Sequence, residues 1–216
     1  MPTMLDRVAE IGVVPVIAID SVAHALPLAD ALLAGGLPVV EITFRTAAAE
    51  AVIRLLAKER PALTVGAGTV LSPETVKTAA EAGARFAVAP GLNPRVVQAA
   101  QDLGLPFVPG VANPSDIEAG LELGCTLLKF FPAEALGGTR LLSALSAPYR
   151  HTGARFMPTG GVSPSNLEAY LKIDTVAAVG GTWIAKQEDM AAGRWGEIAQ
   201  RCRDACALVA AARAAK

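Results

Sequence analysis

Short apolar runs rich in β-branched residues alternate with Ala- and Leu-rich segments of helical periodicity along the whole chain. Each apolar run predicts a buried strand, and each segment between two runs predicts a helix. A strand followed by a helix, repeated many times, favours parallel strands joined by crossover helices. The eight predicted strands span residues 13–19, 38–43, 63–68, 85–90, 106–110, 126–131, 155–160 and 175–181.

Eight strand–helix units are the number that closes a parallel sheet, so the pattern predicts an α/β fold of the (β/α)8 TIM barrel class. The nearly continuous apolar strands agree, because parallel strands are covered on both faces. A doubly wound open sheet is the alternative, but no G-x-G-x-x-G fingerprint follows the first strand. With 216 residues and no linker or low-complexity segment, residues 1–216 are expected to form a single barrel domain.

The predicted helices carry start signals at their amino ends. Segments 22–36, 47–59 and 73–84 place apolar residues at the i, i+3 and i+4 spacing of one helix face. Ser-Pro or Asn-Pro pairs, which suit a capped first turn, follow four strands. These pairs lie within residues 71–74, 92–95, 112–115 and 162–165, and a closing helix is predicted from about residue 196 to 216.

Charge and cysteine content exclude several classes of function. The net charge is −1 without a basic block, which argues against binding to nucleic acid or to an anionic membrane. No apolar run is long enough to span a membrane, and the first residues lack the pattern of a signal peptide. An odd number of cysteines suggests a reducing compartment, so the cytoplasm is expected. Cys202 and Cys206 share a helix face without further ligands nearby, which indicates packing rather than a metal site.

Lys129 is the one lysine that falls within a predicted strand, in the run "TLLKFF". Burial disfavours the charged ammonium and favours the neutral amine, which can attack a carbonyl to form a Schiff base. Catalytic groups of such barrels lie at the carboxyl ends of the strands, where this lysine is expected. The alternative is a lysine that only forms an ion pair with an interior carboxylate.

Glu41 interrupts a second apolar strand, in the run "PVVEIT". An ion pair with Lys129 would be one explanation, but Schiff-base chemistry also needs a carboxylate that moves protons. A nearby carboxylate favours the charged amine whereas burial favours the neutral one, and the sequence leaves open which effect is larger. Arg45, just beyond the strand, could bind a substrate carboxylate through two hydrogen bonds or lie on a helix surface.

Glycine pairs follow the last two strands, in "TGGVSPSN" and "VGGTW". The loops after strands seven and eight often bind phosphate in such barrels, since glycine lets backbone N–H groups approach an anion. Glycine also serves ordinary turns, but two pairs in these two loops favour a phosphate site. The two histidines, His24 and His151, lie in a helix and a loop and are not expected to be catalytic.

Seven motifs, in order between about residues 10 and 185, resemble those of the KDPG/KHG aldolase family, the 2-dehydro-3-deoxy-6-phosphogluconate aldolases. They are "VEITFRT", "GAGTV", "FAVAPG", "PFVPGVANPSD", "LKFFPAE", "PTGGVSP" and "VGGTW". The resemblance implies a class I aldolase that needs neither a metal nor an organic cofactor. It implies that Lys129 forms the Schiff base, that Glu41 is the general acid and base, and that Arg45 and Thr69 bind the substrate carboxylate.

The resemblance also implies which residues surround the rest of the substrate. Thr159 carries the hydroxyl found in gluconate-type enzymes, whereas galactonate-type relatives tend to have an aliphatic residue there. Relatives often have serine at the position of Thr182, which is a small departure. The positions matching the pyruvate pocket or the phosphate loops are Pro90, Phe131, Thr159, Gly160, Gly161, Gly181 and Thr182.

The implied reaction is cleavage of 2-dehydro-3-deoxy-6-phosphogluconate to pyruvate and glyceraldehyde 3-phosphate, a step of the Entner–Doudoroff pathway. A 4-hydroxy-2-oxoglutarate aldolase, or another pyruvate-dependent aldolase, is the alternative and would use the same lysine. Two further alternatives are a sugar-phosphate-binding barrel without activity and an isomerase or decarboxylase that forms no Schiff base. The partner is thus expected to be a small phosphorylated keto-sugar acid, and the resemblance implies a homotrimer.

Overall fold

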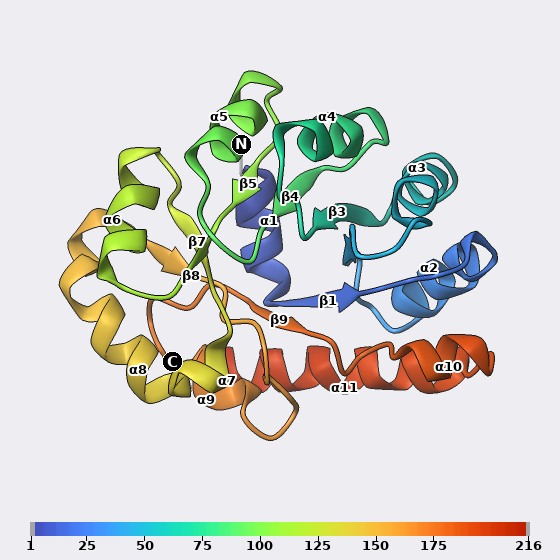
Figure 1. Cartoon of the computed structure of the whole chain (residues 1–216). Coiled ribbons are helices and arrows are strands. Elements are labelled where there is room, and N and C mark those ends of the chain that lie inside the picture. The colour runs from blue at the N-terminus through green and yellow to red at the C-terminus, as the bar shows by residue number, and fades with distance from the viewer. Residues whose placement is uncertain (1–2, 215–216) are drawn as a thin grey trace.

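Parallel strands form the inner layer of the protein and helices cover their outer face (Figure 1). The computed structural model describes residues 3–214. The strands are β1 (Val13–Ile17), β2 (Val39–Thr43), β3 (Thr64–Gly68), β4 (Phe86–Val88), β5 (Phe107–Val108), β6 (Gly110–Val111), β7 (Leu127–Phe130), β8 (Arg155–Phe156) and β9 (Val179–Gly181).

The helices follow the strands in alternation, as the sequence predicts, and an additional helix precedes β1. They are α1 (Met4–Ile11), α2 (Ala25–Ala34), α3 (Ala49–Glu59), α4 (Pro73–Glu81), α5 (Pro94–Asp102), α6 (Pro114–Glu122), α7 (Ala133–Leu136), α8 (Gly138–Ser146), α9 (Leu167–Leu171), α10 (Gln187–Ala191) and α11 (Trp195–Ala214). Two 3₁₀ helices complete the set, at Val22–His24 and Ala147–Thr152.

The strand order follows the chain. One sheet has the order β5-β4-β3-β2-β1-β9 and a second has β6-β7-β8, with all pairs parallel. The predicted α/β fold with a curled parallel sheet is therefore confirmed. A doubly wound sheet is wrong for this chain, because the last strand lies beside the first and no reversal of strand order divides the sheet.

Pro109 explains why the predicted fifth strand is divided into β5 and β6. Proline has no N–H, so it cannot donate to a neighbouring strand, but its carbonyl accepts the N–H of Lys129 at 2.8 Å. Beyond this residue the chain changes partner, from β4 to β7. The seventh and eighth strands are also shorter than predicted, and isolated bridges at Phe156–Val176 and Thr159–Gly180 continue their pairing.

Three of the four predicted helix starts are confirmed. Ser72, Asn93 and Asn113 each accept a backbone N–H of the first turn, and a proline occupies the following position. The fourth is wrong, because α9 begins only after Asn166. The Ser163 hydroxyl forms a hydrogen bond with the Ser165 hydroxyl instead of a helix N–H, and a turn precedes the helix.

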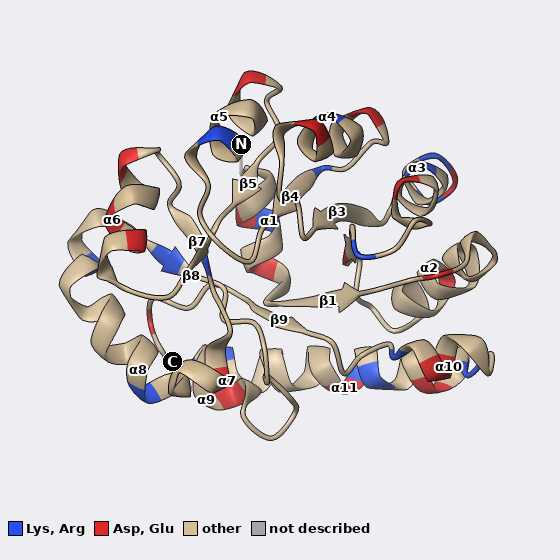
Figure 2. Ribbon diagram, viewed as in Figure 1, with Lys and Arg blue, Asp and Glu red and all other residues tan. Residues whose placement is uncertain are grey.

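Helix α1 lies at the amino ends of the strands. Its Asp6 carboxylate pairs with Arg155, the first residue of β8, at 2.9 Å. Apart from Arg155, the only charged residues in the described strands are Glu41 and Lys129. Charged side chains otherwise lie on helices and loops (Figure 2). None of the helices within residues 3–214 combines the length and apolar character that crossing a membrane requires.

Gly66 in β3 provides space for a large core side chain. A Cβ atom there would lie 2.2 Å from Phe86 Cζ, inside the ring's van der Waals envelope. We predict that Gly66→Ala lowers the free energy of unfolding by about 1–3 kcal/mol through overpacking. Chemical denaturation followed by circular dichroism measures the change.

Gly196 in α11 is the matched control, because no atom lies within 4 Å of the Cβ that alanine would add. Its replacement by alanine should be neutral or stabilising by up to about 1 kcal/mol, since alanine has the higher helix propensity. Equal losses in the two variants would contradict the packing argument.

Candidate active site

A lysine and a glutamate meet in the interior of the fold. Lys129 Nζ lies 3.3 Å from Glu41 Oε1, and their side chains are 6% and 0% exposed. Lys129 comes from β7 and Glu41 from β2, which are not neighbours in either sheet. The contact therefore spans the concave face of the curled strands. Both predicted catalytic residues are brought together, away from bulk solvent.

The Glu41 carboxylate is only half used by the protein. Its Oε2 atom is buried and has no hydrogen-bond partner within residues 3–214. A buried carboxylate oxygen without a donor is costly, so this atom is placed to accept a proton or a hydrogen bond from a bound molecule. Gly68 makes room for the group, because a Cβ there would lie 2.2 Å from Glu41 Oε1.

Phe131 forms one side of the lysine's surroundings. Lys129 Nζ lies 5.6 Å from the centre of the Phe131 ring, a distance at which a cation and an aromatic face attract each other. The same ring lies close to Gly160, whose added Cβ would be 3.3 Å from Cε2. The phenyl group thus connects the lysine with the first predicted phosphate loop.

Arg45 opens onto a cavity of about 430 Å³ at the carboxyl ends of β1, β2 and β9. Within the described part of the chain its guanidinium pairs with no carboxylate, so it is available to an anion. Thr43 also lines this cavity and lies two residues beyond Glu41 in β2, so the two side chains share one face of the sheet. The residues lining the cavity are Val16, Ala18, Thr43, Arg45, Thr182, Trp183, Ala185, Lys186 and Gln187.

Thr69 and Pro90 lie beyond the carboxyl ends of β3 and β4. Thr69 has φ of 57°, which makes it the only residue other than glycine with positive φ in the described chain. This conformation is unfavourable for a β-branched residue, and such strain often marks a functional loop. Pro90 borders a separate surface depression with Val70 and Leu71, so the structure does not bring it into the cavity of Arg45.

The first glycine pair is held from behind by α7 and by the turn before α9. The Gly160 carbonyl accepts the N–H of Glu134 at 3.0 Å, and the Gly161 carbonyl accepts the Asn166 side-chain amide at 3.1 Å. Both glycines have positive φ, of 95° and 80°. Thr159, which precedes them, is buried with its hydroxyl directed at the Met157 carbonyl.

The second glycine pair lies under an indole ring. A Cβ at Gly181 would fall 1.7 Å from Trp183 Cζ3, so only glycine allows the ring to cover β9. Trp183 both packs on the core and lines the cavity, next to Thr182, which is exposed. Arg45 and Thr182 therefore meet at one cavity, although they come from strands at opposite ends of the sequence.

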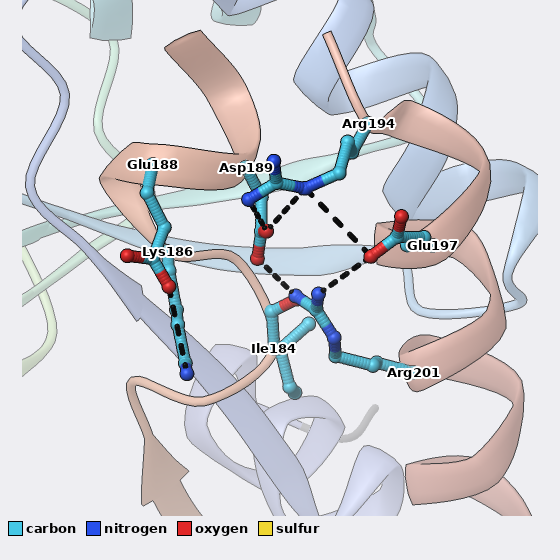
Figure 3. A network of polar contacts seen from close by, with 7 residues as sticks. All are labelled: Ile184, Lys186, Glu188, Asp189, Arg194, Glu197 and Arg201. Atoms are coloured by element: carbon cyan, nitrogen blue, oxygen red, sulfur yellow. Dashed lines mark hydrogen bonds and ion pairs between the residues drawn. The ribbon is translucent and has the colours of Figure 1, made fainter. Parts of the chain in front are cut away.

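A buried carboxylate fixes the chain just after Thr182 (Figure 3). Asp189 in α10 accepts hydrogen bonds from Arg194 at 2.6 and 2.9 Å and from Arg201 at 2.5 Å. Arg201 also donates to the Ile184 carbonyl at 3.1 Å. The bonds from Arg201 and Arg194 outweigh burial and lower the pKa of Asp189 to about 2.

Similarity to characterised proteins agrees with this geometry. Residues 4–201 match the family described as "KDPG and KHG aldolase". The 2-dehydro-3-deoxy-phosphogluconate aldolase of Haemophilus influenzae is 44% identical over 206 residues, which cover 95% of this chain and 96% of the relative. This chain belongs to the KDPG and KHG aldolase family.

Solved structures of the aldolase family have the same fold. A KDPG aldolase from Legionella pneumophila, with pyruvate captured as a covalent carbinolamine, aligns with a TM-score of 0.89 at 40% identity. The alignment covers 93% of this chain and 97% of that one. The Zymomonas mobilis 2-keto-3-deoxy-6-phosphogluconate aldolase with 3-phosphoglycerate has a TM-score of 0.87 at 39% identity, with 95% and 96% covered.

Sequence analysis of this aldolase family member did not identify Lys186, Gln187 or the Asp189 network. Lys186 and Gln187 lie on a loop and in the first turn of a short helix, where charged and polar residues are ordinary. Their only signal is proximity to the glycines of β9. His24 packs against Trp195, and His151 is exposed. Cys202 is buried, and residues 3–214 contain no cluster of three or more metal-ligating side chains.

The Asp189 network gives a prediction about pH. Because the pKa of Asp189 is lowered from 3.8 to about 2, its ionised form stabilises the folded protein above pH 3.8. This contribution, about 2 kcal/mol, is lost as the pH falls through 3.8 toward 2. The difference in free energy of unfolding between wild type and Asp189→Asn should be constant from pH 7 to 5 and shrink below pH 4. Urea titrations across this range measure it, and a pH-independent difference would contradict the assignment.

Proposed function

We propose that this chain is a class I aldolase in which Lys129 forms a Schiff base with the ketone of 2-dehydro-3-deoxy-6-phosphogluconate and Glu41 transfers the protons. The products are pyruvate and glyceraldehyde 3-phosphate, and the reaction belongs to the Entner–Doudoroff pathway. The main support is the buried Lys129–Glu41 pair, in which the second carboxylate oxygen of Glu41 has no hydrogen-bond partner among the described residues. Membership of a family in which pyruvate has been captured as a carbinolamine supports it.

Glu41 lies within one hydrogen bond of the amine, so it can accept a proton from the Lys129 ammonium and leave a nucleophile. The amine adds to the C2 ketone, and loss of water from the carbinolamine gives an iminium. Glu41, directly or through a water, removes the proton of the C4 hydroxyl. The C3–C4 electron pair then moves into the iminium, which acts as the electron sink in place of a metal. Protonation of the resulting enamine and hydrolysis release pyruvate and the free lysine.

Two groups of residues at the carboxyl edge are assigned to the two charged ends of the substrate. Arg45 is an unpaired cation near Glu41 and is assigned, with Thr69, to the carboxylate. The phosphate is assigned to the glycine loops and Thr182, where positive-φ glycines leave the backbone open to an anion. Pro90 and Phe131 are assigned to the pyruvate pocket, and Thr159 is assigned to the hydroxyl position of the gluconate-type enzymes.

A 4-hydroxy-2-oxoglutarate aldolase is not favoured as the main activity. The relatives from Haemophilus influenzae and Treponema pallidum, at 44% and 43% identity, carry the name 2-dehydro-3-deoxy-phosphogluconate aldolase. The bound phosphoglycerate in the Zymomonas mobilis structure also supports a phosphorylated substrate.

We further propose that the strands close into one eight-stranded barrel and that residues 1–216 form one domain. Residues 107–111 contribute to both sheets, and bridges link the chain near β8 with that near β9. The unpaired cysteines support a cytoplasmic location, and family membership supports a homotrimer. A mass of 22.1 kDa in analytical ultracentrifugation, which is that of one chain, would contradict the trimer.

Covalent trapping tests the role of Lys129. Incubation with pyruvate and sodium borohydride should reduce the iminium and leave a 1-carboxyethyl group on the amine of this lysine, which peptide mass spectrometry will locate. Lys172, exposed on the protein surface, is the internal control and should remain unmodified. Labelling of another lysine with Lys129 intact would refute the assignment.

Replacement of the proposed proton carrier tests the role of Glu41. Glu41→Gln keeps the shape of the side chain but cannot transfer protons in the same way. Its kcat should fall by roughly 10²- to 10⁴-fold, the range typical for loss of general acid–base catalysis. Steady-state assays with a coupled pyruvate readout measure this, and a decrease of only a few-fold would remove Glu41 from the mechanism.

A further inference from the structure

We propose that Arg201 and Asp189 are positioning residues for the phosphate end of the substrate. Together they fix residues 182–187, the segment that forms one wall of the cavity containing Arg45 (Figure 3). This inference rests on the proposed function, because it assumes that the cavity receives a phosphorylated substrate. It assigns roles to two residues that never touch the reacting atoms.

The segment carries the features expected of an anion-binding wall. Thr182, Lys186 and Gln187 all line the cavity, and Arg45 faces it from β2. No acidic residue contributes to the lining, so its formal charge is positive. The nearby Asp20 carboxylate accepts a hydrogen bond from Gln187 at 2.6 Å, which holds the start of α10 against the loop after β1. The ammonium of Lys186 lies 3.7 Å from Glu188, and both side chains are more than half exposed.

Arg201 attaches this wall to the long closing helix at two points. One guanidinium nitrogen lies 3.1 Å from the Ile184 carbonyl, within the segment, and 2.5 Å from Asp189, just after it. The chain between Ile184 and Asp189 contains Lys186 and Gln187. Because both ends of this stretch are bound to the same guanidinium nitrogen, their separation is set by the two N–H directions of that nitrogen.

The network of Asp189 and Arg201 contributes more to the position of residues 182–187 than to the stability of the fold. Compared with well-packed apolar residues in the same site, a buried ion pair contributes little net stability, because desolvation of the charges offsets their attraction. The Asp189 side chain is only 4% exposed, and apolar residues could fill such a site. An apolar residue could not, however, donate to the Asp189 carboxylate and the Ile184 carbonyl together, as the planar nitrogen of Arg201 does. The network therefore selects one position of the segment.

The effect should be confined to one end of the substrate. Lys129 and Glu41 lie on β7 and β2, and neither contacts Arg201 or Asp189. Schiff-base formation with pyruvate should then survive loss of the network. Recognition of the phosphate, by contrast, depends on the position of residues 182–187, and a displacement of about 1 Å can cost up to 10²-fold.

Two matched variants separate positioning from stability. Arg201→Met removes the bonds to both Asp189 and Ile184, whereas Arg194→Met removes bonds to Asp189 but leaves Ile184 untouched. Each protein is assayed in the synthetic direction with pyruvate and either glyceraldehyde 3-phosphate or unphosphorylated glyceraldehyde. Borohydride trapping gives the pyruvate concentration for half-maximal adduct formation, and thermal melting reports stability.

Arg201→Met should reduce the preference for the phosphorylated aldehyde, expressed as the ratio of the two kcat/KM values, by about tenfold or more. Half-saturation by pyruvate should stay within about twofold of wild type, since the chemistry at Lys129 is unaffected. Arg194→Met should retain the wild-type preference even if its melting temperature falls. Arg201→Lys keeps the charge but replaces the fixed, planar N–H groups by a shorter side chain with a freely rotating ammonium, so it should fold and recover only part of the preference.

The inference is overturned if folded Arg201→Met or Arg201→Lys keeps the wild-type preference, or if Arg194→Met loses it equally. It is also overturned if the rates with both aldehydes and with pyruvate trapping decline in the same proportion. Should Arg201→Met fail to fold, Arg201→Lys decides alone. Failure of the proposed function looks different, because the wild type itself would then show no adduct at Lys129 or no preference for phosphate.

Discussion

The contact between Lys129 and Glu41 is the constraint on which the rest of the site depends. Two ionisable groups in an apolar interior are tolerated only if they are paired, and a pair from distant strands needs a sheet curled enough to bring β7 opposite β2. The pair also requires glycine at position 68, because a methyl group there would displace the Glu41 carboxylate. The curvature of the fold and the chemistry of the site are therefore one requirement.

The strands separate stability from chemistry along their length. At their amino ends Arg155 meets Asp6 of α1 in an ion pair that is partly open to solvent. At their carboxyl ends lie an unpaired arginine, a strained threonine and the glycine loops. An elongated substrate with a negative group at each end can lie across this edge with its ketone near the lysine. Specificity then comes from loops, which can vary while the strands keep the reacting groups in place.

Much of this arrangement could be predicted from sequence, and the reasons are local. Lys129 and Glu41 stand out because charge rarely interrupts an apolar strand, and parallel strands place such residues on a common edge. Ser72, Asn93 and Asn113 start helices as expected because a cap acts within one turn. The delayed start of α9 was not predicted, since it depends on which partner the Ser163 hydroxyl selects.

What sequence could not provide are contacts made by ordinary-looking residues far apart in the chain. Asp189 and Arg201 lie twelve positions apart on different helices, and neither has an unusual neighbour. Asp189 stands out because it is buried, and the sequence of a polar helix does not indicate which of its charged residues is buried. Pro90 borders a depression apart from the Arg45 cavity, and its assignment to the pyruvate pocket stays a prediction.

Thr69 combines an unfavourable backbone conformation with a hydroxyl at the carboxyl edge of the strands. Its left-handed backbone costs about 1–2 kcal/mol relative to a relaxed residue, and glycine would avoid that cost. Glycine would also delete a hydroxyl at the carboxyl edge of the strands. Relief of the backbone strain at position 69 and retention of that hydroxyl therefore exclude each other, so a stabilising change that leaves this edge intact has to lie elsewhere in the chain.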